Sequence, residues 1–266
     1  MEETSAARPL DLTRQIVMIS ATVFMLIGDM VGIGLFGGTS VQDLQGGAFD
    51  TDASYLSPAR SAFSIWGVIY LFLIAYTVWQ ALPGQRASRR QRAIGWWIAL
   101  TAVLNGLWLV TAQLSTLPVT VAAIIALLIA LAITFQRTVA VPAEGFVDKL
   151  LIDGGVGLHL GWVTLATVAN IAAWLTASGV QTDAADLWGV VVLIAVAAIG
   201  VAIALLSRGR VAPSIPLAWG LAWLAVARLT DEPHSTAIGV TAIVVAVLVL
   251  LAPAIVLIGR ARPVSA

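Results

Sequence analysis

Eight long apolar stretches constrain this chain more than any other feature. A helix rises about 1.5 Å per residue, so about 20 apolar residues cross the hydrocarbon core of a bilayer. Soluble domains carry about 25% charged residues, whereas this chain has only 11% charged and 60% hydrophobic residues. We therefore expect an all-α integral membrane protein. The predicted transmembrane helices are Gln15–Phe36, Ala62–Leu82, Ile94–Ala112, Pro118–Phe135, Gly155–Leu175, Leu187–Leu206, Val211–Leu229 and Ala237–Ile258.

The basic residues test this number of helices independently, because Lys and Arg concentrate in cytoplasmic segments. With eight crossings and a cytoplasmic N-terminus, 12 of the 14 basic residues fall inside, and only Arg60 and Arg228 fall outside. Omitting one helix would destroy this alternation further along the chain. We therefore expect both termini on the cytoplasmic side. The Ala, Val and Arg usage suggests a bacterial cytoplasmic membrane.

Composition and motifs exclude several classes of function. The net charge is zero, which gives no electrostatic basis for nucleic-acid binding. The chain has no cysteine, so thiolate chemistry and Cys-ligated metals are excluded, and it contains only two histidines, His159 and His234. It lacks a phosphate-binding loop, a zinc-protease motif and a serine-hydrolase motif. We expect no metal site and no required cofactor. The inventory favours a function without catalysis, and an enzyme for a membrane-dissolved substrate is the alternative, with Asp29 or His159 as its active group.

Polar residues within the predicted helices are candidate functional residues, because burying them in lipid costs free energy. Asp29 lies about seven residues from the outer end of the first helix, and Asn105 lies in the middle of the third. His159 and Asn170 are eleven residues apart in the fifth helix, which places them on one face. Asp29 is a candidate proton or polar site. The alternative for all four is structural: hydrogen bonds between helices for Asp29, Asn105 and Asn170, and a core histidine for His159.

Two further features leave alternatives open. Gly28 and Gly32 are four residues apart in the first helix, and such small residues let two helices approach closely. This face packs either within the bundle or between the protomers of a homodimer.

The first outer loop, Gly37–Ser61, is long enough to be a functional lid or simply a solvated tether.

Three short motifs occur in the second, third and fifth predicted helices. They consist of Pro58, Trp66 and Tyr70; Leu104, Asn105 and Trp108; and Trp162, Ala166 and Asn170. Their order and spacing resemble those of the TspO/MBR family, the tryptophan-rich sensory proteins and translocator proteins. The chain departs from the family pattern at Arg60, Ala62, Ser64 and the pair Leu158–His159, which would alter the lining of a family-like pocket.

The resemblance covers about residues 14–178 and implies a five-helix transmembrane bundle at 1–178. Residues 179–266 then form an extension of three further helices. The family implies a membrane receptor or sensor that binds a flat apolar ligand, such as a porphyrin or a haem-type ligand, in an aromatic-lined pocket. Aromatic rings offer large rigid faces for such a ligand, and Asn side chains can orient its polar edge.

The expected partners are therefore the lipid bilayer and a small apolar ligand. The candidate ligand-binding residues are Trp66, Tyr70, Asn105, Trp108, His159, Trp162 and Asn170. Core packing without a ligand is the alternative for the aromatic residues. The alternative function is a transporter of a hydrophobic or amphipathic small molecule, with proton coupling through Asp29. Against it, the sequence shows no internal repeat and no interrupted helices of the kind that transporters use.

Overall fold

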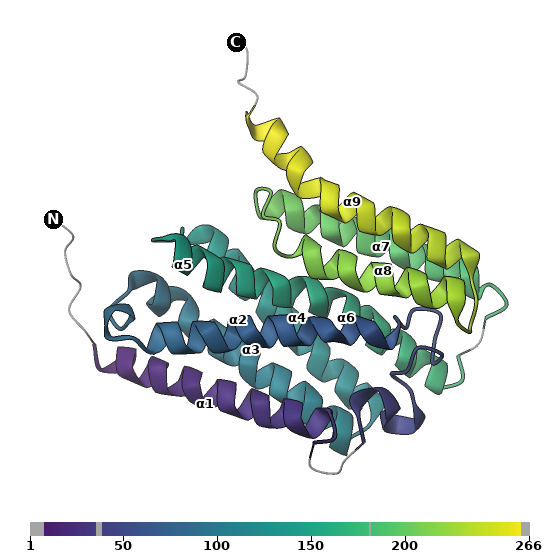
Figure 1. Ribbon diagram of the computed structural model, residues 1–266, viewed down its shortest axis with the longest axis horizontal. Coiled ribbons are helices and arrows are strands. Elements are labelled where there is room, and N and C mark those ends of the chain that lie inside the picture. Colours follow the sequence, from purple (N-terminus) through teal and green to yellow (C-terminus); the bar gives the residue numbers. More distant parts are fainter. Residues whose placement is uncertain (1–7, 36–38, 181, 262–266) are drawn as a thin grey trace. The chain divides into compact units, whose positions relative to one another are not determined.

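The computed structural model describes residues 8–35, 39–180 and 182–261, and the described part of the chain contains helices and no strands (Figure 1). The predicted fold class, an all-α membrane protein, is therefore confirmed. The α-helices are α1 (Pro9–Gly32), α2 (Ile65–Ala81), α3 (Arg89–Leu114), α4 (Leu117–Ala140), α5 (Phe146–Asp148), α6 (Gly155–Ala177), α7 (Ala185–Leu206), α8 (Ser214–Thr230) and α9 (Thr236–Ala261). Short 3₁₀ segments occupy Val41–Gly46, Arg60–Ser64 and Pro83–Gln85, and a π-helical segment occupies Lys149–Gly154.

Local sequence signals set several of the helix boundaries. Pro9 is the first residue of α1, where its missing N–H is not needed. The Ser88 side chain caps α3 by accepting a hydrogen bond from the Gln91 N–H at 3.3 Å. Among the described residues, seven helices are long and apolar enough to cross a membrane. The seventh predicted span, Val211–Leu229, corresponds to α8, which is apolar but has only 17 residues, two fewer than predicted. Pro216 lies in its first turn, where proline is tolerated.

The fifth predicted span begins earlier than expected. Helix continues from Phe146 to Ala177, whereas the prediction began at Gly155. The charged residues between these two starting points suggested a loop. In the structure, Asp148 and Asp153 lie on this helical segment and both accept hydrogen bonds from the buried Arg90 of α3. Pairing therefore keeps charged residues in a segment that hydropathy alone excludes.

The chain forms two compact units. Unit 1 comprises Met1–Val41 and Trp66–Leu160, and unit 2 comprises Gln42–Ile65 and Gly161–Ala266. The first outer loop from Gln42 onward thus belongs to unit 2, with the last three helices. Helix α6 contributes its first residues to unit 1 and the rest to unit 2. The division at residue 178, expected from the resemblance, stays a prediction.

In unit 1, α3 packs against both α1 and α4. A Cβ atom added to Gly28 would lie 3.3 Å from the Gly106 carbonyl oxygen, and one added to Gly32 would lie 2.9 Å from the Leu109 side chain. The small-residue face of α1 therefore packs against α3 within the chain. A homodimer stays a separate prediction.

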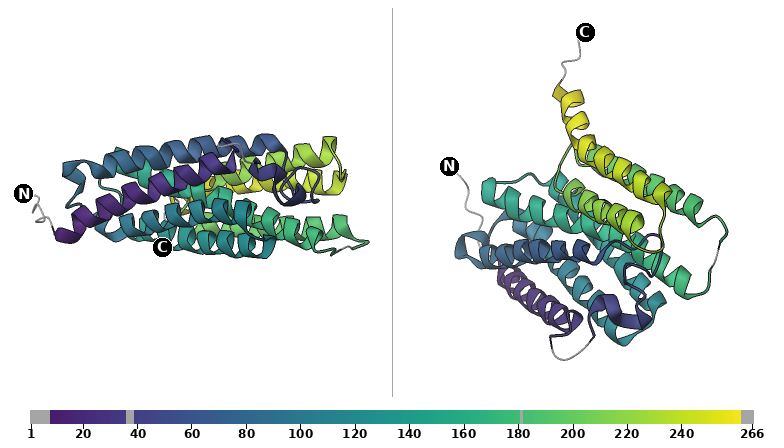
Figure 2. Two further views of the ribbon diagram at one scale, coloured as in Figure 1. Left: turned by 90° about the horizontal axis from the view of Figure 1, so that it is seen from below. Right: turned by 45° about the vertical axis from the view of Figure 1, so that its right-hand side comes forward.

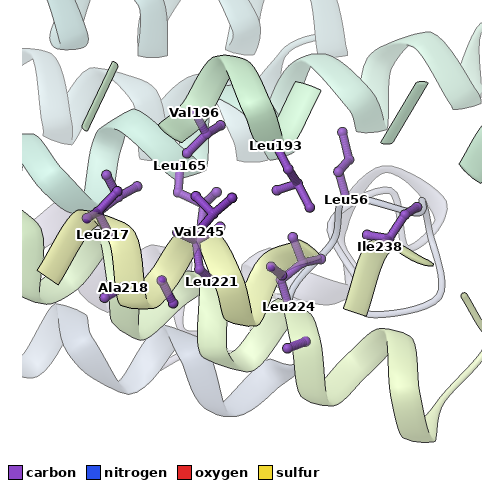
Figure 3. Packing of buried hydrophobic residues seen from close by; sticks show 14 residues of the cluster. Leu56, Leu165, Leu193, Val196, Leu217, Ala218, Leu221, Leu224, Ile238 and Val245 are labelled. Carbon is purple, nitrogen blue, oxygen red and sulfur yellow. The ribbon is translucent and has the colours of Figure 1, made fainter. Parts of the chain in front are cut away.

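In unit 2, α9 packs against α7 and α8, as two views of the molecule show (Figures 1 and 2). Buried side chains from these three helices point toward one another in a common core, with Leu165 of α6 among them (Figure 3). Leu56 of the first outer loop belongs to the same core. The loop is therefore anchored by an apolar side chain, which argues against a fully solvated tether.

Candidate functional site: an aromatic and polar cluster in unit 1

Three aromatic side chains from two helices stack on one another in unit 1. Trp66 and Tyr70 are four residues apart on α2, so their side chains share a face. Their ring centroids are 5.2 Å apart, and the ring planes differ by 25°. Trp108 of α3 also stacks on Trp66, with its centroid 6.1 Å from that of Trp66 and an angle of 25° between the ring planes. Tyr70 and Trp108 are buried, whereas Trp66 is half-buried and forms the accessible part of the stack.

His159 closes the cluster from the first part of α6. Its ring meets Trp66 edge to face, with the centroids 5.8 Å apart. The side chain is 1% exposed, and neither ring nitrogen has a hydrogen-bond partner. A neutral imidazole carries one donor and one acceptor, and leaving both unpaired inside a protein costs free energy. The His159 ring therefore has one donor and one acceptor that no group in the described structure uses.

The Tyr70 hydroxyl links the aromatic stack to two polar residues. It accepts a hydrogen bond from Asn105 Nδ2 at 3.2 Å. It also interacts with the Asp29 carboxylate of α1, to which a phenol hydroxyl can donate. Asn105 is fully buried, and its Oδ1 has no partner. The structure thus brings together Asp29, Tyr70 and Asn105, which the sequence distributes over three helices.

Two of the candidate residues, Trp162 and Asn170, lie in unit 2. Trp162 is 2% exposed and meets Phe63 edge to face, with centroids 5.9 Å apart. A Cβ atom added to Gly220 of α8 would lie 3.3 Å from the Trp162 ring. Asn170 Nδ2 donates to the Ala166 carbonyl of its own helix at 2.8 Å. In the structure, Trp162 therefore packs within unit 2, and the Asn170 amide bonds to its own helix.

Sequence reasoning missed the role of three buried arginines. Arg90 pairs with Asp148 and Asp153, as described above. Arg14 of α1 donates to the carbonyls of Gln85 and Arg86 at 3.3 and 3.2 Å. The prediction placed Arg14 and Arg90 in cytoplasmic segments and Arg228 at the outer end of the seventh span, because Lys and Arg concentrate at the ends of transmembrane helices. The spacing of their acidic and carbonyl partners is not readable from the sequence.

Arg228 is the third of these arginines and fastens the first outer loop to α8. It is completely buried and donates to the carbonyls of Thr51 at 2.6 Å, Ser54 at 3.2 Å and Pro233 at 2.8 Å. Two further hydrogen bonds join the end of the loop to α8: Ala59 N–H to the Trp223 carbonyl, and Trp219 Nε1 to the Ala62 carbonyl. The helix that follows carries Trp66.

An ion-pair group holds the exposed side of the same loop. Arg60 donates to Asp43 at 2.6 Å and to both carboxylate oxygens of Asp50, at 2.7 and 2.5 Å. These hydrogen bonds hold the pKa of Asp50 below its ordinary value. Arg60 is one of the departures from the family pattern, and here it serves to order the loop.

The cluster offers little to a metal ion. Over residues 8–35, 39–180 and 182–261, no group of three His, Cys, Asp or Glu side chains is placed to hold one.

The fold and the cluster together define an all-helical integral membrane protein with an aromatic and polar site among its helices. A family model described as TSPO-like protein matches residues 15–255, so the chain belongs to this family. The match includes α7, α8 and most of α9. From the three sequence motifs, these helices were expected to form an extension beyond the family bundle. Searches of curated proteins and of solved structures returned no match.

Proposed function

We propose that the protein is a membrane receptor or sensor that binds a planar apolar ligand, such as a porphyrin, at the cluster of Trp66, Tyr70, Asn105, Trp108 and His159. The observation that carries the proposal is the stack of Trp66 on Tyr70 and Trp108, bordered by unpaired polar atoms of Asn105 and His159. Aromatic faces favour a flat ring, and the unpaired atoms offer hydrogen bonds to its polar edge. Family membership supports a ligand-binding role of this kind.

Tryptophan fluorescence tests this proposal in detergent-purified protein. Protoporphyrin IX should quench the emission saturably at micromolar concentration. The variant Trp66→Phe, Trp108→Phe should bind about tenfold more weakly, because each ring loses stacking area. The matched control is Trp188→Phe, which removes an indole that is 59% exposed on α7 of unit 2. Equal, unsaturable quenching of all three proteins would mean nonspecific partitioning and would refute the proposal.

The second candidate is a transporter of a hydrophobic or amphipathic small molecule with proton coupling through Asp29. The interaction of Asp29 with the Tyr70 hydroxyl favours it, because intramembrane carboxylates in polar networks are common in proton relays. Substrate flux into proteoliposomes should then respond to a pH gradient and lose that response in Asp29→Asn. Flux that follows the gradient equally in the variant would exclude Asp29 as the coupling residue.

The remaining functional expectations follow from this proposal. The expected partners are the bilayer and the ligand, and no nucleic-acid partner is expected. A homodimer stays a prediction. No cofactor is required for binding, and a haem-type ligand would meet His159. A bacterial cytoplasmic membrane with both termini inside stays the predicted location.

A further inference from the structure

We propose that a ladder of polar side chains fixes the register of α1 on α2 in unit 1, with Thr22 and Thr77 as its central positioning residues. Register here means which residue of α1 lies at the level of a given residue of α2. The ladder ends at Tyr70 of the candidate ligand site, so its predicted effect on ligand affinity rests on the proposed function. Its predicted effect on register does not.

The ladder begins with the spacing of polar residues along α1. Gln15, Thr22 and Asp29 are seven residues apart, which is close to two helical turns, so the three side chains share one face. A seven-residue repeat is also the spacing at which two packed helices keep facing each other. One face of α1 therefore presents a polar side chain about every 10 Å along the helix.

The partners on α2 follow the same spacing. The hydroxyl oxygens of Thr22 and Thr77 lie 2.7 Å apart, and Asp29 interacts with the Tyr70 hydroxyl. Thr77 follows Tyr70 by seven residues, and Thr22 precedes Asp29 by seven. Two antiparallel helices in one register produce this match, because an equal number of residues on each helix covers an equal rise.

The rung nearest the start of α1 joins two glutamines. Gln15 Nε2 donates to the Gln80 carbonyl at 2.6 Å, and Gln15 Oε1 accepts from Arg86 Nε at 3.2 Å. Gln80 Nε2 donates in return to the Gln15 carbonyl at 3.4 Å. Both glutamines are buried. This rung therefore ties α1 to the end of α2 by hydrogen bonds in both directions.

The central rung selects the register by the partners that a slip would remove. Thr22 and Thr77 are buried, and their hydroxyls also lie near carbonyls of their own helices, those of Met18 at 3.0 Å and Leu73 at 2.7 Å. A hydroxyl has one hydrogen, so one threonine donates across the helices while the other donates within its helix. A slip of one turn would bring Thr22 to the level of Leu73 or Ala81, whose side chains form no hydrogen bonds.

Apolar packing alone would select this register less sharply. Lipid tails are as apolar as Leu, so helices in a membrane gain little from covering apolar faces with one another. Buried polar residues, by contrast, fix the register of paired helices. In this register Asp29 reaches Tyr70, whose ring stacks on Trp66. The ladder thus positions the polar end of the candidate site.

Spin labels test the register without any ligand. The chain has no cysteine, so Ile16→Cys with Leu71→Cys can be labelled selectively, and these side chains are 54% and 64% exposed. Leu71 follows Tyr70 and so lies near the level of Gly28, twelve residues beyond Ile16, or about 18 Å along the axis. A slip of one turn changes this separation by about 5 Å.

Pulsed electron–electron double resonance measures the distance between the two labels. We expect one narrow distribution in the labelled protein with both threonines in place. Adding Thr22→Val and Thr77→Val should broaden the distribution by about 5 Å, because neighbouring registers then cost less free energy.

Ligand affinity tests the effect on the site. The protein is reconstituted into phosphatidylcholine nanodiscs, and protoporphyrin IX is titrated by tryptophan quenching. We expect about threefold weaker binding in Thr22→Val and in Thr77→Val, because hydrogen bonds between membrane helices contribute modestly. The double variant should bind no more weakly than either single variant, since both lose the same hydrogen bond. Thr22→Ser keeps the hydroxyl and should bind as the unmodified protein does.

The matched control is Thr134→Val on α4 of unit 1. Thr134 is fully buried, and its hydroxyl donates to the Ala130 carbonyl of the same helix at 2.6 Å. The variant removes a hydroxyl that bonds within one helix, so the label distance and the affinity should both stay unchanged. Effects in Thr134→Val as large as those in Thr22→Val would refute the inference.

The remaining outcomes separate the ladder from the proposed function. An unchanged label distance in Thr22→Val, Thr77→Val would refute the ladder, whether or not binding weakens. A broadened distance in a protein that does not bind protoporphyrin IX at all would support the ladder and contradict the proposed function.

Discussion

At the scale of single residues, the Tyr70 hydroxyl is the point where the polar and aromatic parts of the cluster meet. It receives a hydrogen bond from Asn105 and interacts with Asp29, while its ring stacks on Trp66. The three candidate residues could be predicted from the sequence as individuals, because polar residues in apolar helices are conspicuous. Their convergence on one hydroxyl could not be predicted, because it depends on how α1, α2 and α3 rotate against one another.

Tyr70→Phe tests this convergence. The variant keeps the ring and removes the oxygen, so Asn105 and Asp29 each lose a partner in an apolar environment. We expect the free energy of unfolding to fall by about 1–2 kcal/mol. Reversible unfolding in mixed micelles measures this change, and Tyr55→Phe in the outer loop is the control. A stability equal to that of the unmodified protein would show that the hydroxyl contributes nothing.

Asp50 gives a prediction about pH at the same scale. Its pKa is lowered by the hydrogen bonds from Arg60, so this pairing stabilises the loop at neutral pH. The stabilisation is lost as the pH falls through the lowered pKa, below the ordinary value of about 4. The protection factors of the loop amides, which compare their exchange with that of an unstructured peptide at the same pH, should therefore fall below about pH 4, and in Asp50→Asn they should be lower already at pH 7. A loop whose exchange has the same pH dependence in both proteins would contradict this account.

At the scale of elements, hydropathy predicted the apolar helices well and failed where charges are paired. The segments that became α2 and α4 are long and mostly apolar, and both form helices as predicted. The segment Phe146–Gly154 was expected to be a loop because it contains Lys149 and two aspartates, and the structure makes it helical by pairing those aspartates with Arg90. Arg228, predicted at the outer end of the seventh span, lies in the last turn of α8, where backbone carbonyls accept hydrogen bonds from its two terminal nitrogens.

The contact between α1 and α3 depends on a residue without a side chain. A Cβ atom on Gly106 would lie 2.7 Å from the Phe24 ring and 3.1 Å from the Met25 Cα. Gly106→Ala should therefore push the two helices apart and lower stability by about 1–3 kcal/mol. The matched control is Gly67→Ala on α2, where a Cβ atom would meet nothing within 4 Å. If both variants have the same thermal stability in detergent, the close approach is not needed.

Arg228 lets α8 hold the first outer loop. Arg228→Gln leaves the loop carbonyls of Thr51 and Ser54 with fewer donors, and we expect hydrogen exchange of residues 48–58 to increase about tenfold or more. Arg228→Lys should show a smaller increase, because one ammonium cannot reach as many carbonyls as a guanidinium fork. The exchange of α3 in unit 1 serves as the internal reference. Unchanged loop exchange in Arg228→Gln would show that the apolar anchor Leu56 is sufficient.

At the scale of the whole molecule, the chain combines a TSPO-like match over residues 15–255 with two compact units. In the part of the chain that the structure describes, seven helices are long and apolar enough to cross a membrane, and α8 is a shorter apolar helix. The sequence motifs correctly indicated the family. They suggested that residues beyond 178 are an addition, whereas the family match continues through them. In unit 2, the outer loop and the later part of α6 pack with α7, α8 and α9 through apolar contacts. Any long helix of similar composition could make such contacts, so the sequence of the last three helices carries no motif by which the family could be identified.

The central claim is that a planar ligand binds beside Trp66, and photo-oxidation mapping tests it most directly. A bound porphyrin produces short-lived oxidants on illumination, and these modify the Trp and His side chains nearest to it. Peptide mass spectrometry after brief illumination with one equivalent of porphyrin should find modification first at Trp66, Trp108 and His159, before Trp188 and Trp162. Modification spread evenly over the tryptophans, with the exposed Trp188 leading, would contradict the claim.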